Sequence, residues 1–200
     1  MKQKSSIQKL SITCAPDIIR RFTQLLGHGF RVSVTIGGSI REILCGQLGF
    51  KNGYLDDRIQ TLFLNGKAVD DVDTAVVEDA STLSLSAAMP GVAGATMRKG
   101  GRYAAMRSQI SYRSDTASAD RQDGEITLKL FNLVARELGP TFFERGVFFS
   151  GKVIEDFLRL QPDRFLEGLS VKADGRNVEG KALQTLTGET ENIFLQVLSE

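Results

Sequence analysis

The chain of 200 residues carries 25 Lys and Arg against 24 Asp and Glu. The resulting net charge of +1 gives no bulk attraction to nucleic acid or to an anionic membrane, so we expect neither as a partner. Hydrophobic residues make up 42% of the chain and charged residues 24%, as in ordinary globular proteins. The sequence has no apolar run of membrane-spanning length and no signal-peptide core, which predicts a cytoplasmic protein.

The cysteine and histidine content limits the chemistry that the chain can perform. Cys14 and Cys45 are too few for a disulfide framework, and both lie at apolar positions of expected elements, where we expect them to be buried. His28 is the single histidine and lies between two glycines. Its isolation excludes most metal sites and most Ser-His or Cys-His catalytic arrangements. We therefore expect no metal and no cofactor.

The N-terminal part of the chain predicts two strands. Lys9–Cys14 alternates between apolar and polar residues, and Pro16 ends this strand. The apolar residues between positions 18 and 26 fit either a helical turn or the return strand of a hairpin. Phe30–Ile36 alternates again and predicts the second strand.

A helix is expected next. Ser39 and Glu42 have the spacing of a capping box, in which the two side chains bind backbone N–H groups at a helix start. Apolar residues then recur at helical spacing, and Gly49 is a plausible C-cap. The order of strand, strand, helix and further strands predicts an α+β arrangement with the helix on one face of the sheet.

The stretch from Ile59 to Ala87 predicts a strand, a tight turn and a second strand. The dipeptide Asn65-Gly66 tolerates the positive φ angles of such a turn. The acidic run at residues 70–73 is too polar to bury and is expected to face water. Thr82–Ser86 then alternates, as a strand with one buried face does.

Residues 91–124 predict a linker, because they are rich in glycine, and basic residues occur from Arg98 onward without an acid before Asp115. A basic run of this kind could bind phosphate or nucleic acid, but the neutral chain and the small cluster favour a solvated or partner-facing linker. The candidate interaction residues of the linker are Arg98, Lys99, Arg102, Tyr103 and Arg107.

The second half repeats the pattern. Ile126–Leu130 alternates as a strand, Gly139-Pro140 is expected to break the chain, and Phe142–Phe149 is expected to form a strand. Ser150 is a candidate N-cap for a helix that Pro162 interrupts.

A second strand–turn–strand unit closes the chain, with Asp174-Gly175 as the turn and alternating residues from Ile193 to Val197. Two copies of one pattern predict an internal repeat. We therefore expect two tandem domains, at residues 8–90 and 125–200, with residues 91–124 as a glycine-rich basic linker.

Three stretches carry a resemblance to a known family: residues 35–48, 63–69 and 73–85. They resemble the ubiquitin-like β-grasp fold and, within it, the small sulfur carriers of molybdopterin and thiamine biosynthesis. The resemblance covers most of residues 9–90, and residues 126–198 with a weaker signature. It implies two tandem β-grasp domains, each a mixed sheet with one main helix.

In that family the function resides in a flexible C-terminal Gly-Gly, which threads a channel of an adenylating enzyme where a Cβ would obstruct passage. This chain ends in Leu198-Ser199-Glu200, so we expect it not to be a conventional carrier. Gly100-Gly101 could instead be a masked carrier terminus that is released by cleavage after Gly101, although glycines are common in linkers.

Two functions follow as expectations. The first is a non-catalytic, ubiquitin-like protein that binds a protein partner through an exposed sheet face. The alternative is a sulfur carrier or protein modifier, activated after processing at Gly101 and then partnered by an adenylating enzyme. An enzyme is the weakest expectation, because the sequence shows no convergent histidine, no suggestively spaced carboxylate pair and no phosphate loop.

Overall fold

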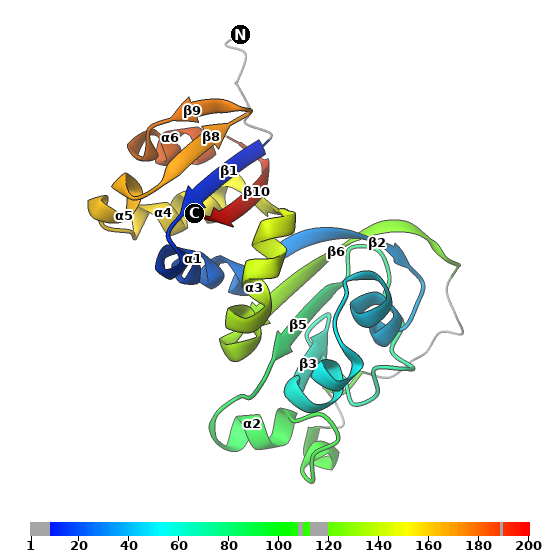
Figure 1. Cartoon of the computed structure of the whole chain (residues 1–200). Helices are drawn as coiled ribbons and strands as arrows, with labels where there is room; N and C mark the ends of the chain where they lie inside the picture. Colours follow the sequence, from blue (N-terminus) through cyan, green and yellow to red (C-terminus); the bar gives the residue numbers. More distant parts are fainter. Residues whose placement is uncertain (1–8, 108–109, 113–119, 189) are drawn as a thin grey trace. The chain divides into compact units, whose positions relative to one another are not determined.

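The computed structural model describes residues 9–107, 110–112, 120–188 and 190–200 (Figure 1). The chain forms two compact units. Unit 2 is Arg31–Val134, and unit 1 combines the described residues through Phe30 with Ala135–Glu200. Both units are of mixed α and β structure, and the ten strands among the described residues pair in both parallel and antiparallel senses. No helix among the described residues is long and apolar enough to cross a membrane.

The described part of unit 2 contains five strands in the order β4-β3-β5-β6-β2. The strands are β2 (Phe30–Ile36), β3 (Thr61–Leu64), β4 (Lys67–Ala68), β5 (Thr82–Ser86) and β6 (Gln122–Phe131), and the helical segments are η2 (Glu42–Gln47), η3 (Tyr54–Arg58), α2 (Gly91–Met97) and η4 (Ala104–Arg107). β3 pairs antiparallel with both β4 and β5, whereas β5 and β6 run parallel. The predicted turn is confirmed, because Asn65 and Gly66 have φ angles of 50° and 78°.

The other five strands of the described residues lie in unit 1, in the order β7-β10-β1-β8-β9. The strands are β1 (Lys9–Cys14), β7 (Val147–Ser150), β8 (Ser170–Ala173), β9 (Arg176–Val178) and β10 (Asn192–Ser199), and the helical segments are α1 (Pro16–Phe22), η1 (Thr23–Gly27), α4 (Gly151–Arg159), α5 (Asp163–Glu167), η5 (Gly180–Ala182) and α6 (Leu183–Gly188). In this unit β1 and β10 run parallel. The helical alternative for residues 18–26 is confirmed, because α1 and η1 cover these residues.

Both predicted helix starts are confirmed by their hydrogen bonds. The Glu42 carboxylate accepts from the backbone N–H of Ser39 at 2.8 Å, and the Ser39 hydroxyl accepts from the N–H of Glu42 at 3.3 Å. The Ser150 hydroxyl accepts from the N–H of Val153 at 3.3 Å. Gly49, with φ of 80°, follows η2 in the left-handed conformation expected of a C-cap residue.

The expected chain break at Gly139-Pro140 is wrong, and the expected strand at residues 142–149 is wrong in its first half. Helix α3 (Asn132–Arg145) continues through Pro140, and β7 begins only at Val147. Gly139 lies so close to Leu26 that a Cβ there would approach Leu26 Cδ1 to 2.7 Å. Phe142 and Phe143 are buried on the helix. The packing of this helix face outweighs the hydrogen bond that proline removes.

The bounds of the two units differ from the expected segments 8–90, 91–124 and 125–200. The N-terminal strand β1 lies in the unit formed by the C-terminal part of the chain, whereas β6 completes the sheet of unit 2. The described residues between positions 91 and 124 are also more regular than a linker, since they include α2, η4 and the start of β6. Each unit thus contains one inner strand that was expected in the other domain: β1 lies in unit 1 and β6 lies in unit 2.

The position of β6 predicts which fragment of the chain folds. A fragment of residues 31–134 keeps the β5–β6 pairing, in which Leu83 lies opposite Leu128 and Leu85 opposite Leu130. A fragment of residues 8–90 lacks β6 and leaves one edge of β5 unpaired. We expect the first fragment to fold and to give well-dispersed amide resonances in proton–nitrogen NMR spectra. We expect the second fragment to stay unfolded and to give poorly dispersed resonances. The reverse result would contradict the observed division.

Candidate interaction surface

The strands of unit 2 present one buried face and one partly exposed face. On β6 the side chains of Ile126, Leu128 and Leu130 are buried, whereas those of Lys129 and Phe131 reach solvent. On β5 the same alternation buries Leu83 and Leu85. The residues on the other face of these strands are mostly small and hydroxylated, so this face offers space above the sheet.

Two adjoining hollows lie at one end of this face. The first has a volume of about 420 Å³ and is lined by Phe63, Ser84, Ser86, Met89, Pro90, Phe131 and Asn132. The second has a volume of about 240 Å³ and is lined by Gln60, Thr61, Ala88, Met89, Gly91, Gly94, Ala95 and Arg98. Met89 lines both hollows, which we therefore name together the Met89 groove.

Asn132 holds one wall of the groove in place. Its φ angle is 53°, a left-handed conformation that asparagine tolerates better than most residues. Its side-chain amide donates to the hydroxyl of Ser86 at 3.2 Å and to the carbonyl of Ala88 at 3.1 Å. These bonds join the end of β6 to the chain that leaves β5. They fix the positions of Phe131 and Met89, which are 38% and 36% exposed.

Two of the five candidate interaction residues of the linker have structural roles. The Arg107 side chain is fully buried and donates to the Asp70 carboxylate at 2.6 Å, to the Thr96 carbonyl at 2.7 Å and to the Ser111 hydroxyl at 2.9 Å. Lys99 donates from Nζ to the Leu55 carbonyl at 2.9 Å, and burial lowers its pKa. Both residues fasten the segment 91–107 to the rest of unit 2.

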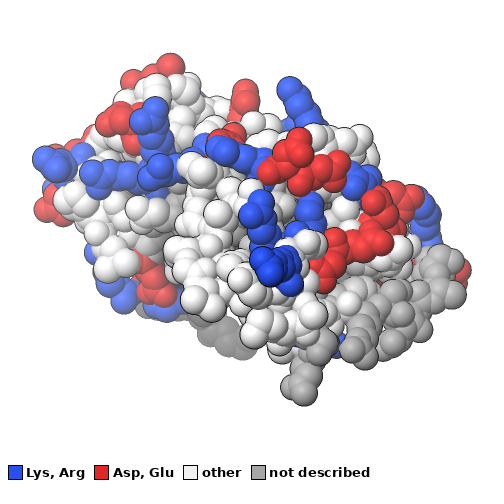
Figure 2. Space-filling view, turned by 90° about the horizontal axis from the view of Figure 1, so that it is seen from below, with Lys and Arg blue, Asp and Glu red and all other residues white. Residues whose placement is uncertain are grey.

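The other three candidates lie at the surface. Arg98, Arg102 and Tyr103 are exposed, and only Arg98 lines the Met89 groove. The acidic run at residues 70–73 is partly solvated, as expected, but Asp70 also binds Arg107 and Asp73 binds Arg41. On the face shown in Figure 2, acidic and basic side chains lie close together with uncharged surface between them.

The candidate carrier tail Gly100-Gly101 lies within a folded turn. Gly100 has φ of 60° and donates its N–H to the Asp70 carboxylate at 2.8 Å. The Gly101 N–H donates to the Arg98 carbonyl at 3.0 Å. Cleavage after Gly101 stays a prediction, to be checked by the mass of the intact protein from its host. These contacts must open before a protease can bind the segment in extended form.

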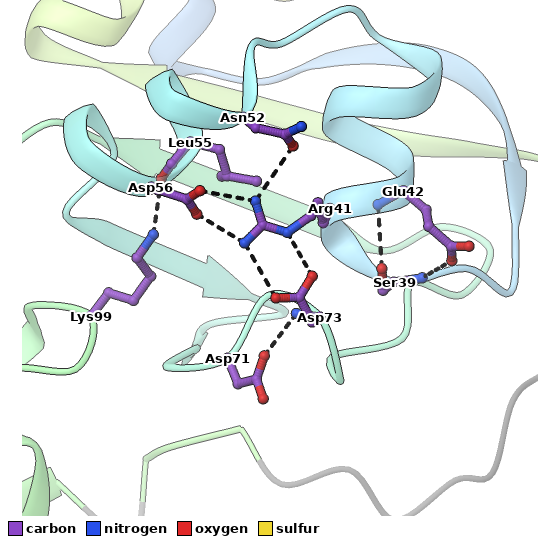
Figure 3. A network of polar contacts seen from close by, with 9 residues as sticks. All are labelled: Ser39, Arg41, Glu42, Asn52, Leu55, Asp56, Asp71, Asp73 and Lys99. Atoms are coloured by element: carbon purple, nitrogen blue, oxygen red, sulfur yellow. Dashed lines mark hydrogen bonds and ion pairs between the residues drawn. The ribbon is translucent and has the colours of Figure 1, made fainter.

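A second polar cluster surrounds Arg41 (Figure 3). Its guanidinium lies between Asp56, at 2.8 Å, and Asp73, at 2.6 Å, and donates to both carboxylates. The hydrogen bonds from Arg41 lower the pKa of Asp56, and the two acids together raise the pKa of Arg41. Both carboxylates are thus used to hold η3 and the 70–73 loop to the start of η2. No three-residue cluster suited to a metal ion is present in the part of the chain that the structure describes.

The two cysteines are unsuited to thiolate chemistry. Cys14 is fully buried, as expected, and burial raises the pKa of its thiol to about 11. Cys45 is only partly buried, so its expected full burial is wrong, although desolvation still raises its pKa. A thiol is reactive as the thiolate, and a raised pKa lowers the fraction of that form at neutral pH.

Sequence reasoning missed the groove residues Met89, Phe131 and Asn132. A signal for Phe131 was present, because the alternation through Ile126, Leu128 and Leu130 places residue 131 on the opposite face from the core. An exposed aromatic side chain is a binding-site signal where it belongs to a larger apolar patch, and Phe131 lines one hollow together with Phe63 and Met89. Nothing local marked Met89, whose position depends on the path of the chain after β5.

The buried Arg107 side chain predicts a large loss of stability on truncation. Arg107→Ala removes the cation bound to the Asp70 carboxylate and the donor to the Thr96 carbonyl, and we expect a loss of about 3 kcal/mol in the free energy of unfolding. Arg102→Ala removes an exposed arginine of the same segment and is expected to change stability by less than about 0.5 kcal/mol. Urea titration measures both values, and equal effects of the two variants would contradict the structural role of Arg107.

The Arg41 cluster predicts a pH-dependent contribution to stability. Because the pKa of Asp56 is lowered in the folded state, its ion pair stabilises the fold above the usual carboxyl pKa of about 4 and is lost as pH falls through the folded value. We expect Arg41→Gln to reduce the urea midpoint at pH 7, and this difference from the unmodified protein to shrink between about pH 4 and pH 2. A difference that stays constant over this range would contradict the assignment.

No protein-family model, curated protein or solved structure matches this chain. In unit 2 the Met89 groove combines an open hollow of about 420 Å³ with the partly exposed side chains of Met89 and Phe131.

Proposed function

We propose that the protein is a non-catalytic interaction module of the β-grasp type that docks a protein partner on the open sheet face of unit 2, at the Met89 groove. The observation that carries the proposal is the partly exposed pair Met89 and Phe131 at an open hollow of about 420 Å³. Aromatic and methionine side chains are enriched at the centres of protein interfaces.

The distribution of exposed apolar side chains supports docking on unit 2. Among the described residues, large hydrophobic side chains with high exposure are concentrated between positions 89 and 133, and Leu160 is the exception in unit 1. The members of this set are Met89, Val92, Tyr103, Met106, Ile110, Phe131 and Leu133. Met89 and Phe131 from this set line the same hollow, and a contiguous exposed apolar area on a folded protein usually marks an interaction site.

The composition of the groove favours binding over catalysis. Its described lining residues include hydroxyl, amide and apolar side chains and one arginine, but no acid, histidine or cysteine. General acid–base or nucleophilic catalysis needs such a group within hydrogen-bond reach of the reacting atoms. The groove therefore offers shape and hydrogen bonds rather than a reactive group.

The β-grasp part of the proposal draws on strand order. In each unit a parallel pair lies inside the sheet, β5 with β6 and β1 with β10. Antiparallel strands flank this pair on both sides in unit 1, and β3 is antiparallel to β5 in unit 2. In unit 2 the helical segment η2 follows β2 and precedes β3, as the resemblance implies. Under this proposal the two copies are related by exchange of an inner strand.

Site-specific photo-crosslinking in the host tests the docking surface. A photoreactive phenylalanine analogue replaces Phe131 in one variant and Leu160, which is 83% exposed, in the control. We expect a discrete adduct with a partner protein from position 131 and none from position 160, because only the first lies in the groove. The same adducts from both positions, or none from position 131, would contradict the proposed function.

A further inference from the structure

We propose that the Met89 groove binds an extended acidic segment of the partner, with one aromatic side chain in the larger hollow and carboxylates on both sides of it. This inference rests on the proposed function and adds the chemistry of the ligand. It follows from the order of side chains along β5, from the lining of the hollow and from the two cations at its ends.

The strand register sets the direction of the groove. Ser84 on β5 lies between Phe63 of β3 and Lys129 of β6, whereas Ser86 lies between Thr61 of β3 and Phe131 of β6. Ala88 and Met89 follow directly beyond the end of β5. The groove therefore runs along β5, from the row of Ser84 past the row of Ser86 to Met89 and the smaller hollow.

The larger hollow fits an aromatic side chain. Its volume of about 420 Å³ lies at the small end of the range of ligand pockets, about 300 to 1,000 Å³. Two phenylalanines, one methionine and one proline line it, and aromatic rings and thioether sulfur interact favourably with an inserted ring.

Two polar side chains of the same hollow favour a ring with a hydrogen-bond donor. The Asn132 amide nitrogen is used by Ser86 and Ala88, so its oxygen remains as an acceptor. The Ser84 hydroxyl forms no hydrogen bond with any residue that the structure describes. Tryptophan and tyrosine combine an apolar ring with such a donor.

Cations stand at both ends of the groove. Lys129 lies directly opposite Ser84 at one end, and Arg98 lines the smaller hollow at the other. Neither side chain forms an ion pair with an acid in residues 9–107, 110–112, 120–188 or 190–200. No acid lines either hollow at the described positions. Acidic residues before and after the aromatic anchor would complement these charges.

The chain's own acidic loop does not supply this ligand readily. Asp70 is bound to Arg107, and Asp73 is bound to Arg41, so a second copy would have to break both contacts to present them. A separate partner segment needs no such rearrangement. This difference favours an external acidic segment over self-association through the loop.

A tryptophan-containing peptide tests the inference directly, because this chain has no tryptophan. The probe is a short synthetic peptide with one central tryptophan and glutamates on both sides, titrated with the full-length protein while tryptophan emission is recorded. We expect emission to move to shorter wavelengths as the indole leaves water. Peptides with glutamine or lysine in place of glutamate are expected to bind more weakly.

Matched variants assign the binding to the groove. Phe131→Ala and, independently, Met89→Ala are expected to reduce the affinity for the peptide at least about ten-fold, as truncation of an interface anchor does. Arg98→Gln and Lys129→Gln are each expected to reduce this affinity about two- to five-fold and to make it less dependent on salt concentration. Arg102→Gln removes an exposed charge that lines neither hollow and is expected to leave affinity unchanged.

Four results would overturn the inference. They are equal affinity for the glutamate and glutamine peptides, no emission change with the glutamate peptide, free tryptophan binding as tightly as the peptide, and a dimer whose formation excludes the peptide. Crosslinking from position 131 distinguishes rejection of the acidic ligand from rejection of the proposed function. A discrete adduct together with charge-independent peptide binding would retain the docking surface and reject only the acidic ligand.

Discussion

The parallel pairing of β5 with β6 is the contact on which the proposed binding surface of unit 2 depends. Ser84 and Ser86 form the floor of the Met89 groove from β5, whereas Phe131 comes from β6 and lies opposite Ser86. The buried faces of the two strands bring Leu83 and Leu85 beside Leu128 and Leu130. Burial of these leucines therefore stabilises the core, and it also sets the position of Phe131 in the groove.

The segment after β5 completes the groove, and its anchors explain why a glycine-rich stretch is ordered there. The fully buried Arg107 side chain connects the Asp70 loop with the Thr96 carbonyl. Gly94 packs against the backbone of Met89, where a Cβ would approach the Met89 carbonyl oxygen to 1.7 Å. Glycine is therefore required for this close approach, and not only for flexibility. The glycine-rich composition, which predicted a linker, here belongs to a segment that packs on the rest of unit 2.

The sequence allowed most of the elements to be predicted, because their signals are local. The alternation in Lys9–Cys14 and Thr82–Ser86 and the capping box at Ser39 each depend on residues within a few positions. The pairing of the strands could not be predicted in the same way. Leu10, Ile12 and Cys14 show the same pattern as Ile126, Leu128 and Leu130, so periodicity does not say which strand joins which sheet. Tertiary packing decides the exchange, as it decides the path of α3 through Pro140.

Hydrogen–deuterium exchange of the full-length protein, alone and with the partner recovered by crosslinking, tests the docking surface most directly. Binding at the Met89 groove predicts slower exchange at residues 84–90 and 130–132, and unchanged exchange in α4 of unit 1. Slower exchange in α4 with no change along β5 and the end of β6 would contradict the account.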